Sequence, residues 1–299
     1  MLIKLDLPTL ERPINANSGW SVDGMSSTDL YERINLALLM GIAIFANLIF
    51  SPTVTQLQST KTEVKPYESD ASKREQVEQM FDSISHRYDF LNHFLSLGID
   101  NIWRKRAIGK LKSLQPKRIL DVATGTADLA IAALALNPDK IVGVDISNKM
   151  LDVGRAKIAK RGLDKIELKN GDSENLPFDD NSFDAITVAF GVRNYQNLEA
   201  GLNEMKRVLR PGGKLVVLEF SKPSVFPIKQ IFNFYSKYIL PIWGKLFSGS
   251  TEAYVYLPES VKHFPEGEEF TDILQKCGYQ NTNITRLTFG ISSIYEGTK

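Results

Sequence analysis

One stretch of this chain constrains its fold more than any other, because an apolar strand there runs into a turn of small residues and then into a helix. Residues 118–122 predict the strand, residues 123–126 the turn, and residues 127–137 an Ala- and Leu-rich helix. A ligand bound to such a unit lies at the carboxyl end of the strand, where the first N–H groups of the helix have no partner. Small residues let the backbone approach that ligand closely. Tight strand-to-helix packing is the alternative without a ligand.

Acidic residues lie at the ends of three predicted strands. Asp121 lies in the first strand, and Asp145 ends the strand over residues 140–144, 24 positions later. This is about the separation at which a nucleotide-binding βαβ unit places a carboxylate on the ribose hydroxyls. Asp172 follows the strand over residues 165–169, where a carboxylate can accept a hydrogen bond from an adenine amino group. A solvated turn is the alternative for Asp172 alone, but its place beside Asp121 and Asp145 favours a shared ligand site.

Phosphate-rich ligands are not expected in this site. The dinucleotide motif G-x-G-x-x-G would need glycine where the chain has Ala123, Gly125 and Asp128, and only one of the three is glycine. No G-x-x-x-x-G-K-[ST] loop for a nucleoside triphosphate occurs either. A nucleoside without phosphates remains, and S-adenosylmethionine is the commonest such cofactor on a fold of this class.

The composition argues against several classes of function. The chain has 299 residues, 43% of them hydrophobic, and a net charge of +1, so it gives no electrostatic argument for binding nucleic acid. It has one cysteine, Cys277, and 3 histidines, so we expect no internal disulfide, no Cys/His zinc site and no other metal. We expect Cys277 to be a packed small hydrophobe. These features are typical of a reducing, cytoplasmic setting.

The first residues differ from the rest of the chain. Residues 34–50 form an apolar run without charges, slightly short of the ~20 residues that span a bilayer. Two interpretations remain open, a membrane anchor and a translated upstream stretch outside the functional protein, and the second is slightly favoured. We therefore expect a poorly ordered extension over residues 1–65 and one folded domain over residues 66–299.

After residue 75, strands and helices alternate, which predicts an α/β fold with a mostly parallel seven-stranded sheet and helices on both faces. Two helices, over residues 77–94 and 102–114, precede the first strand as an N-terminal cap. A turn is predicted at residues 210–213, because proline ends a helix and glycine supplies unusual φ angles. The aromatic-rich residues 221–265 predict a lid. The other predicted elements are strands at 185–190, 214–220, 281–287 and 290–296, the last two as an antiparallel pair, and helices at 147–161, 197–209 and 267–277.

These features resemble those of class I S-adenosylmethionine-dependent methyltransferases, which have a Rossmann-like fold. Within that class, five further motifs are similar to those of the menaquinone and ubiquinone biosynthesis C-methyltransferases, and the similarity covers residues 66–299. The motifs are Tyr88-Asp89-Phe90-Leu91-Asn92, residues 96–104 (SLGIDNIWR), Phe190-Gly191-Val192-Arg193-Asn194, Leu218-Glu219-Phe220-Ser221-Lys222-Pro223 and Tyr256-Leu257-Pro258-Glu259-Ser260. The first 65 residues have no counterpart in this family pattern.

The resemblance implies a set of cofactor contacts. Thr126 is expected near the methionine part of S-adenosylmethionine, Asp145 on the ribose, and Asp172 near the adenine. Ala189 departs from those members that have a serine before Phe-Gly, since alanine cannot make the polar contact. Ala127 replaces the last glycine of the loop, and a methyl group is tolerated there if this residue is already helical. The full expected cofactor set, in which Ser173 accompanies Asp172, is Asp121, Gly125, Thr126, Asp145, Asp172 and Ser173.

For the methyl acceptor, the resemblance implies a reduced quinone, whose ring carbon becomes nucleophilic when the adjacent phenol loses its proton. Arg193, at the end of the fourth strand, is expected to accommodate that phenolate charge, with a structural ion pair as its alternative. Asn194 is expected to help orient the ring. Tyr88 and Asp89 are expected to close over the cofactor from the N-terminal cap, with ordinary packing as their alternative.

The expected reaction is C-methylation of demethylmenaquinol to menaquinol with S-adenosylmethionine as the donor. C-methylation of a benzoquinol in ubiquinone biosynthesis, methylation of another small molecule and a non-catalytic cofactor-binding scaffold are the alternatives. The expected partners are an isoprenoid quinol and the inner face of the cell membrane, to which the aromatic stretch attaches the enzyme peripherally. A homodimer is left open, and no nucleic-acid partner is expected.

Overall fold

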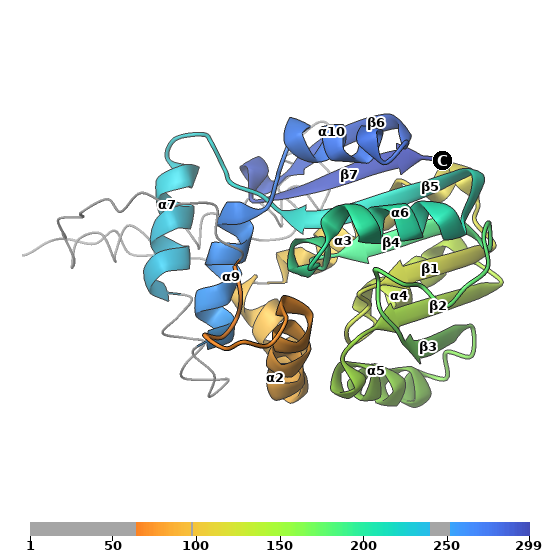
Figure 1. The fold of residues 1–299 in the computed structure, drawn as a ribbon, viewed down its shortest axis with the longest axis horizontal. Helices are drawn as coiled ribbons and strands as arrows, with labels where there is room; N and C mark the ends of the chain where they lie inside the picture. The colour runs from red at the N-terminus through yellow and green to blue at the C-terminus, as the bar shows by residue number, and fades with distance from the viewer. Residues whose placement is uncertain (1–63, 97, 240–251) are drawn as a thin grey trace, which may run out of the picture.

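A seven-stranded sheet in the order β3-β2-β1-β4-β5-β7-β6 forms the centre of the computed structural model, which describes residues 64–96, 98–239 and 252–299 (Figure 1). The first five strands run parallel, and β7 pairs antiparallel with both β5 and β6. The predicted sheet and its antiparallel final pair are therefore confirmed. The strands are β1 (Arg118–Val122), β2 (Lys140–Asp145), β3 (Ile166–Asn170), β4 (Phe183–Ala189), β5 (Leu209–Phe220), β6 (Gln280–Leu287) and β7 (Ser292–Thr298).

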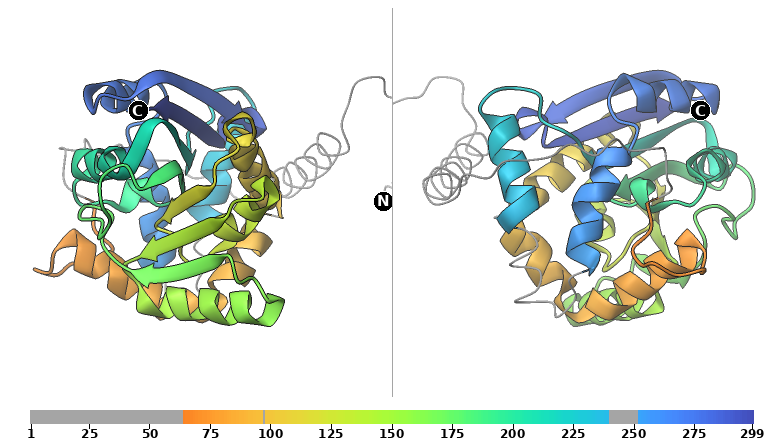
Figure 2. Two further views of the ribbon diagram at one scale, coloured as in Figure 1. Left: turned by 90° about the vertical axis from the view of Figure 1, so that its right-hand side faces the viewer. Right: turned by 60° about the vertical axis from the view of Figure 1, so that its left-hand side comes forward.

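Helices cover both faces of the sheet (Figure 2). Helices α3 and α4 bury Trp103 and Ala130 against one face, and α6 and α10 bury Met205 and Phe270 against the other. The helices are α2 (Lys73–Leu95), α3 (Ile99–Gly109), α4 (Asp128–Ala133), α5 (Asn148–Arg161), α6 (Leu198–Val208), α7 (Ile228–Phe234), α9 (Glu252–His263) and α10 (Glu268–Lys276). Shorter helical turns are η1 (Lys112–Leu114), η2 (Leu134–Leu136), η3 (Val192–Asn194), η4 (Tyr235–Ile239) and η5 (Thr288–Gly290).

The order in which the chain adds strands to the sheet places a ligand site between β1 and β4. From β1 the chain adds β2 and β3 on one side, and it then returns to add β4 and β5 on the other side. Loops leaving the carboxyl ends of β1 and β4 therefore diverge to opposite faces, and in open α/β sheets ligands bind in the crevice at such a switch point.

The turn predicted before the fifth strand is present as a bulge inside β5. Leu209 pairs with Phe183 and Lys214 pairs with Ala185, so residues 210–213 loop out between two paired positions. Gly212 adopts a φ of 78°, which a residue with a Cβ rarely adopts. The predicted turn is correct, but the strand begins before the turn, at Leu209, and not after it.

Helices α2, α7 and α9 lie beyond the carboxyl edge of the sheet, on the left of Figure 1. The predicted N-terminal cap helix is α2, which packs Val77, Met80 and Ile84 against Tyr256 of α9. The predicted aromatic lid contributes α7, η4 and α9, while its residues 240–251 lie outside the described residues, as do residues 1–63 with the apolar run 34–50. None of the helices that the structure describes is long and apolar enough to span a bilayer.

Candidate functional site

Two adjoining cavities open at the carboxyl edge of the sheet. The smaller lies under α2 and is lined by the loops that follow β1, β2, β3 and β4. The larger, of about 620 Å³, lies between α2, α3, α7 and α9 and has mostly apolar walls. Phe81, Tyr88 and Phe190 line both, so the cavities meet at these three side chains. Two reactants held one in each cavity would meet there.

Asp145 organises the smaller cavity at the end of β2. Its carboxylate accepts hydrogen bonds from the Gly125 N–H at 2.8 Å and the Ser147 N–H at 2.9 Å. Burial raises the pKa of Asp145 to about 6, and the two backbone hydrogen bonds lower it in part. Because the side chain also lines the cavity, it presents a carboxylate to a ligand while holding the glycine loop in place.

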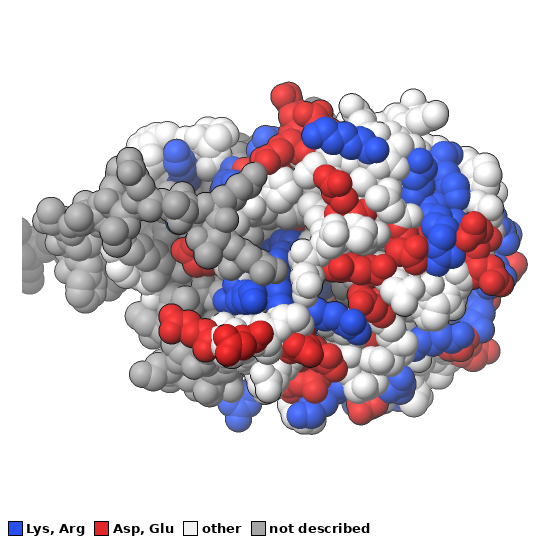
Figure 3. Space-filling view, viewed as in Figure 1, with Lys and Arg blue, Asp and Glu red and all other residues white. Residues whose placement is uncertain are grey.

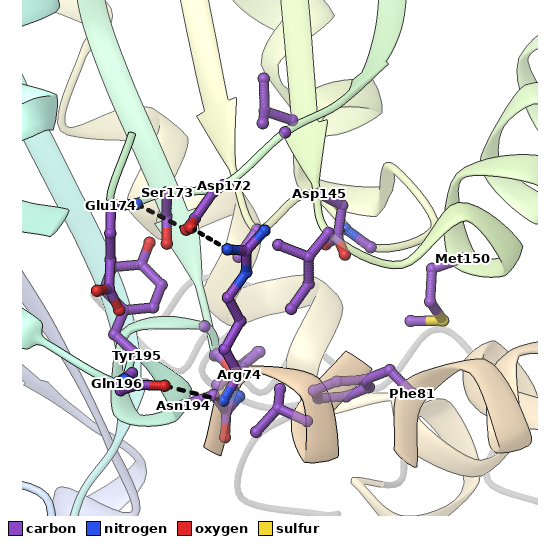
Figure 4. Close-up of a pocket in the computed structure, with 18 of the residues that line it drawn as sticks. Arg74, Phe81, Asp145, Met150, Asp172, Ser173, Glu174, Asn194, Tyr195 and Gln196 are labelled. Carbon is purple, nitrogen blue, oxygen red and sulfur yellow. Dashed lines mark hydrogen bonds and ion pairs between the residues drawn. The ribbon is translucent and has the colours of Figure 1, made fainter. Parts of the chain in front are cut away.

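Asp172 and Ser173 line the same cavity at the end of β3, where Arg74 from α2 reaches across to them (Figure 4). The Arg74 guanidinium lies 3.1 Å from the Asp172 carboxylate, and the Arg74 N–H donates to the Gln196 side chain at 3.4 Å. Asp172 also accepts a hydrogen bond from the Glu174 N–H at 2.9 Å. Sequence reasoning missed Arg74, because nothing in a helix sequence tells which surface residue crosses to another element.

Asn194 lines the smaller cavity, although we predicted that it would orient the acceptor ring. Its Nδ2 donates to the Phe190 carbonyl at 3.4 Å, while its buried Oδ1 accepts no hydrogen bond within the described protein. A buried acceptor without a donor is unfavourable, so Oδ1 indicates a ligand with an N–H or O–H at this point. Carboxylates at Asp145 and Asp172 and this amide oxygen fit the hydroxyl and amino groups of S-adenosylmethionine.

Two predicted cofactor residues, Asp121 and Thr126, lie beside the cavity and are not among its lining side chains. The buried Asp121 carboxylate accepts hydrogen bonds from the hydroxyls of Thr124 at 2.6 Å and Thr187 at 2.7 Å, and burial raises its pKa to about 6. The Thr126 hydroxyl donates to Asp89 at 2.5 Å. Asp121 therefore ties the loop after β1 to β4, and Thr126 ties it to α2.

Tyr88 and Asp89 both come from α2, but only Tyr88 faces the cavities. Burial raises the pKa of the Tyr88 hydroxyl. The Asp89 carboxylate lies 2.6 Å from the Lys157 ammonium on α5, in addition to its contact with Thr126. Asp89 thus fastens the cap helix to the cofactor loop from outside the cavities.

The loops around the smaller cavity contain alanine and phenylalanine residues in left-handed backbone conformations. The φ angles are 52° at Ala123, 68° at Ala127 and 58° at Phe190. Such angles cost of order 1 kcal/mol each or more and persist where the surrounding structure enforces them. The helix predicted from residue 127 begins one residue later, because Ala127 precedes α4 as a left-handed cap residue, so the condition stated for tolerating its methyl group is not met. Gly125, with a φ of 54°, lies where an added Cβ would be 3.3 Å from Met150.

Arg193 faces the larger cavity from η3, in an ion pair with a buried carboxylate. Its guanidinium lies 2.7 Å from Glu219 on β5, and it also donates to the Phe190 carbonyl and to Ser260. The Glu219 side chain is fully buried, which raises its pKa, while Arg193 lowers it in part. The alternative stated for Arg193, a structural ion pair, is thus present, and the pair lies at the wall of a cavity.

Comparison with known proteins agrees with this geometry. Residues 69–299 match the model of the ubiE/COQ5 methyltransferase family. The chain belongs to this family. A protein named demethylmenaquinone methyltransferase from Bacteroides fragilis is 52% identical over 79% of this chain and 97% of its own, and one from Porphyromonas gingivalis is 43% identical over 79% and 98%. A ubiquinone/menaquinone biosynthesis C-methyltransferase from Geotalea daltonii is 45% identical over 76% of this chain and 97% of its own.

Solved structures of other methyltransferases have the same fold as this chain. An S-adenosylmethionine-dependent methyltransferase from Thermotoga maritima matches 74% of this chain and 98% of its own with a TM-score of 0.53 and 20% identity. A second, from Aquifex aeolicus, matches 70% and 96% with a TM-score of 0.51 and 19% identity. The Rossmann-like class I fold is confirmed, and S-adenosylmethionine is the methyl donor of this fold and family. Within the described ranges no group of three or more His, Cys, Asp or Glu side chains is arranged to hold a metal ion.

Proposed function

We propose that this methyltransferase converts demethylmenaquinol to menaquinol by methylating a ring carbon. The observation that carries the proposal is the pair of adjoining cavities. One is lined by carboxylates and by an amide oxygen that has no hydrogen-bond partner among the described residues, and the other is large, apolar and bordered by the Arg193–Glu219 pair. The first suits S-adenosylmethionine, and the second suits a ring with an isoprenoid tail.

The residues of this chain align the reactants and stabilise charge. When bound, S-adenosylmethionine would supply an electrophilic methyl group and keep the electron pair of its sulfur–methyl bond as the ring carbon takes the methyl group. The proton displaced from that ring carbon would pass to solvent water. Tyr88 and Phe190, which line both cavities, border the meeting point of the two reactants. Arg193 stabilises the phenolate oxygen beside the reacting carbon, because a guanidinium presents a positive charge and fixed N–H donors.

The relatives favour a naphthoquinol over a benzoquinol. The relatives from Bacteroides fragilis and Porphyromonas gingivalis carry the name demethylmenaquinone methyltransferase, whereas the Geotalea protein is named for both quinones. We expect purified full-length protein to methylate demethylmenaquinol with a kcat/KM at least about tenfold above that for a benzoquinol of equal tail length, since pocket contacts to one additional ring are of this order. Product formation is followed by mass spectrometry with a labelled methyl donor.

Each alternative has its own outcome in this assay. A preference for the benzoquinol would assign the chain to ubiquinone biosynthesis. Tight cofactor binding by calorimetry without methylation of either quinol would favour the non-catalytic scaffold. We expect neither result. The names of the relatives argue against the benzoquinol, and a scaffold has no need of a buried charge pair at the wall of the acceptor cavity.

Exposed hydrophobic side chains on loops that lead into the walls of the larger cavity favour peripheral attachment to the inner face of the cell membrane. Within the described ranges, the strongly exposed large hydrophobic side chains are Val225, Phe226 and Phe289, at 56%, 77% and 56% exposure. They lie on two loops that touch, since the Ser221 N–H donates to the Ile291 carbonyl at 2.9 Å. Both loops lead into walls of the cavity, at α7 and at Ile291. The surface over the upper part of α7 is neutral apart from a basic group (Figure 3).

Phe226→Asp combined with Phe289→Asp is expected to weaken binding to phospholipid vesicles at least about tenfold, because each large side chain contributes about 1.5–3 kcal/mol on full burial in an apolar phase. Vesicle sedimentation measures the binding, and Ala135→Asp with Gln280→Asp, both at exposed positions, adds the same charge as a control. Turnover of a short-tailed, water-soluble acceptor should be unchanged. Equal vesicle binding with an altered oligomeric state would assign these residues to a homodimer contact instead.

A further inference from the structure

Two arginines, and not one, present buried guanidinium groups to the larger cavity. Arg193 comes from η3 and Arg104 from α3, and both side chains are 7% exposed. Arg104 lies 5.9 Å from the centre of the Phe190 ring, and Arg193 lies 5.4 Å from that of Phe220. The two rings are stacked with centres 4.5 Å apart. The arginines therefore flank one aromatic pair, beside the side chain of Phe190, at which the two cavities meet.

Arg104 is held in place by carboxylates outside the set that we predicted from the sequence. It forms a close ion pair with Asp100, one turn earlier on α3, and its other nitrogen lies 3.8 Å from Asp128. Asp100 in turn accepts a hydrogen bond from the Ser96 hydroxyl at 2.8 Å and lies 2.8 Å from the ring nitrogen of His93. This support fixes the guanidinium at the cavity wall, where side-chain entropy no longer opposes ligand binding.

Burying an arginine at the wall of an apolar cavity costs free energy unless other groups pair with its charge and accept hydrogen bonds from its N–H donors. A guanidinium presents five N–H donors in a rigid fork, more than its hydrogen bond to Asp100 takes up. Replacing a buried ion pair by packed hydrophobic residues is often neutral or stabilising, so stability does not require one here. A second such pair beside Arg193–Glu219 indicates a ligand with polar atoms at two separate points of its ring.

We propose that Arg104 binds the second ring oxygen of the quinol, the one para to the oxygen that Arg193 stabilises. This inference rests on the proposed function, because a quinol carries two oxygens at opposite ends of the ring. Arg193 would then act on the phenolate next to the reacting carbon, and Arg104 would fix the ring orientation that presents this carbon to the methyl group. Arg104 would thereby select a 1,4-diol over a simple phenol.

The test compares two acceptors on the same protein preparation. One is a 1,4-dihydroxynaphthalene with a short prenyl group, and the other is the matching 1-naphthol without the second hydroxyl. We expect wild-type protein to prefer the diol in kcat/KM, and Arg104→Lys and Arg104→Gln to reduce this preference by about tenfold to a hundredfold, the size of a hydrogen bond to a charged group. Lys105→Gln, at an exposed position on the same helix, should leave the preference unchanged.

A ratio measured on one preparation does not depend on how much of the variant is folded. If both Arg104 variants lose activity toward the two acceptors by the same factor, Arg104 only supports the structure and the proposal is wrong. If the Arg104 variants fail to fold, a binding measurement on wild-type protein alone still tests the proposal. The wild-type protein must bind the diol at least about tenfold more tightly than the naphthol. Equal binding would also overturn the proposal. If wild-type protein methylates neither acceptor, it is the proposed function that fails.

Discussion

Replacing Arg193 with alanine is expected to lower turnover of the quinol by about 10²–10³-fold, the usual effect of removing a group that stabilises charge in the transition state. The same change should destabilise the fold by about 3–5 kcal/mol, because it leaves the fully buried Glu219 carboxylate without its 2.7 Å partner. Affinity for S-adenosylmethionine should change little, since Arg193 lines the other cavity. Steady-state kinetics, denaturant unfolding and calorimetry measure the three quantities.

The double variant Arg193→Ala with Glu219→Gln separates the two roles of this arginine. Removing the buried charge should restore most of the lost stability, while the neutral amide still accepts a hydrogen bond from the Phe220 N–H, now 2.9 Å from Glu219. Turnover should remain low, because nothing replaces the guanidinium. Recovery of turnover together with stability would show that Arg193 acts only as a structural partner of Glu219.

The sheet and part of the cofactor site could be predicted because both follow from local patterns. Apolar runs separated by helical periodicity determine a parallel sheet, and the carboxyl ends of parallel strands meet at one edge. Asp145 and Asp172 each follow such a strand, so their common cavity follows from sequence order alone. The exposed Phe289 gave no comparable signal, because the contact between its loop and the loop that contains Phe226 joins segments far apart in the sequence.

The other half of the site depends on which way side chains point, which a sequence pattern does not determine. Arg193 and Asn194 are neighbours in the short helical turn η3, and consecutive residues there face different cavities. Arg74 and Arg104 belong to α2 and α3, helices with charged residues on several sides. Only the packing of those helices in the folded chain decides which cation lines a cavity. Ala127 shows the same limit for the backbone, because tertiary contacts impose a left-handed angle that alanine does not favour.

Replacing Asp145 with asparagine is expected to weaken binding of S-adenosylmethionine by about tenfold to a hundredfold, because hydrogen bonds to a charged acceptor contribute about 1.5–3 kcal/mol each. Asparagine keeps one oxygen for the Gly125 or Ser147 N–H groups and so preserves the loop better than alanine does. Isothermal calorimetry measures the affinity. Asp152→Asn, at an exposed position on α5, is the matched control. Unchanged affinity in the Asp145 variant would remove this carboxylate from the ribose site.

The pH dependence of binding gives a second, independent test of Asp145. Burial raises its pKa from the ordinary 3.8 to about 6 in the free protein, so the carboxyl gains its proton as the pH falls through that value. A protonated carboxyl accepts hydrogen bonds from ribose hydroxyls poorly, so cofactor affinity should weaken below about pH 6 and level off above it, and Asp145→Asn should abolish the slope. Stability changes in the opposite sense, because a raised pKa favours the folded state at low pH and this contribution is lost as the pH rises from 3.8 to about 6. Asp121 has the same shift but does not line the cavity, so it contributes to the pH dependence of unfolding while cofactor affinity reports on Asp145.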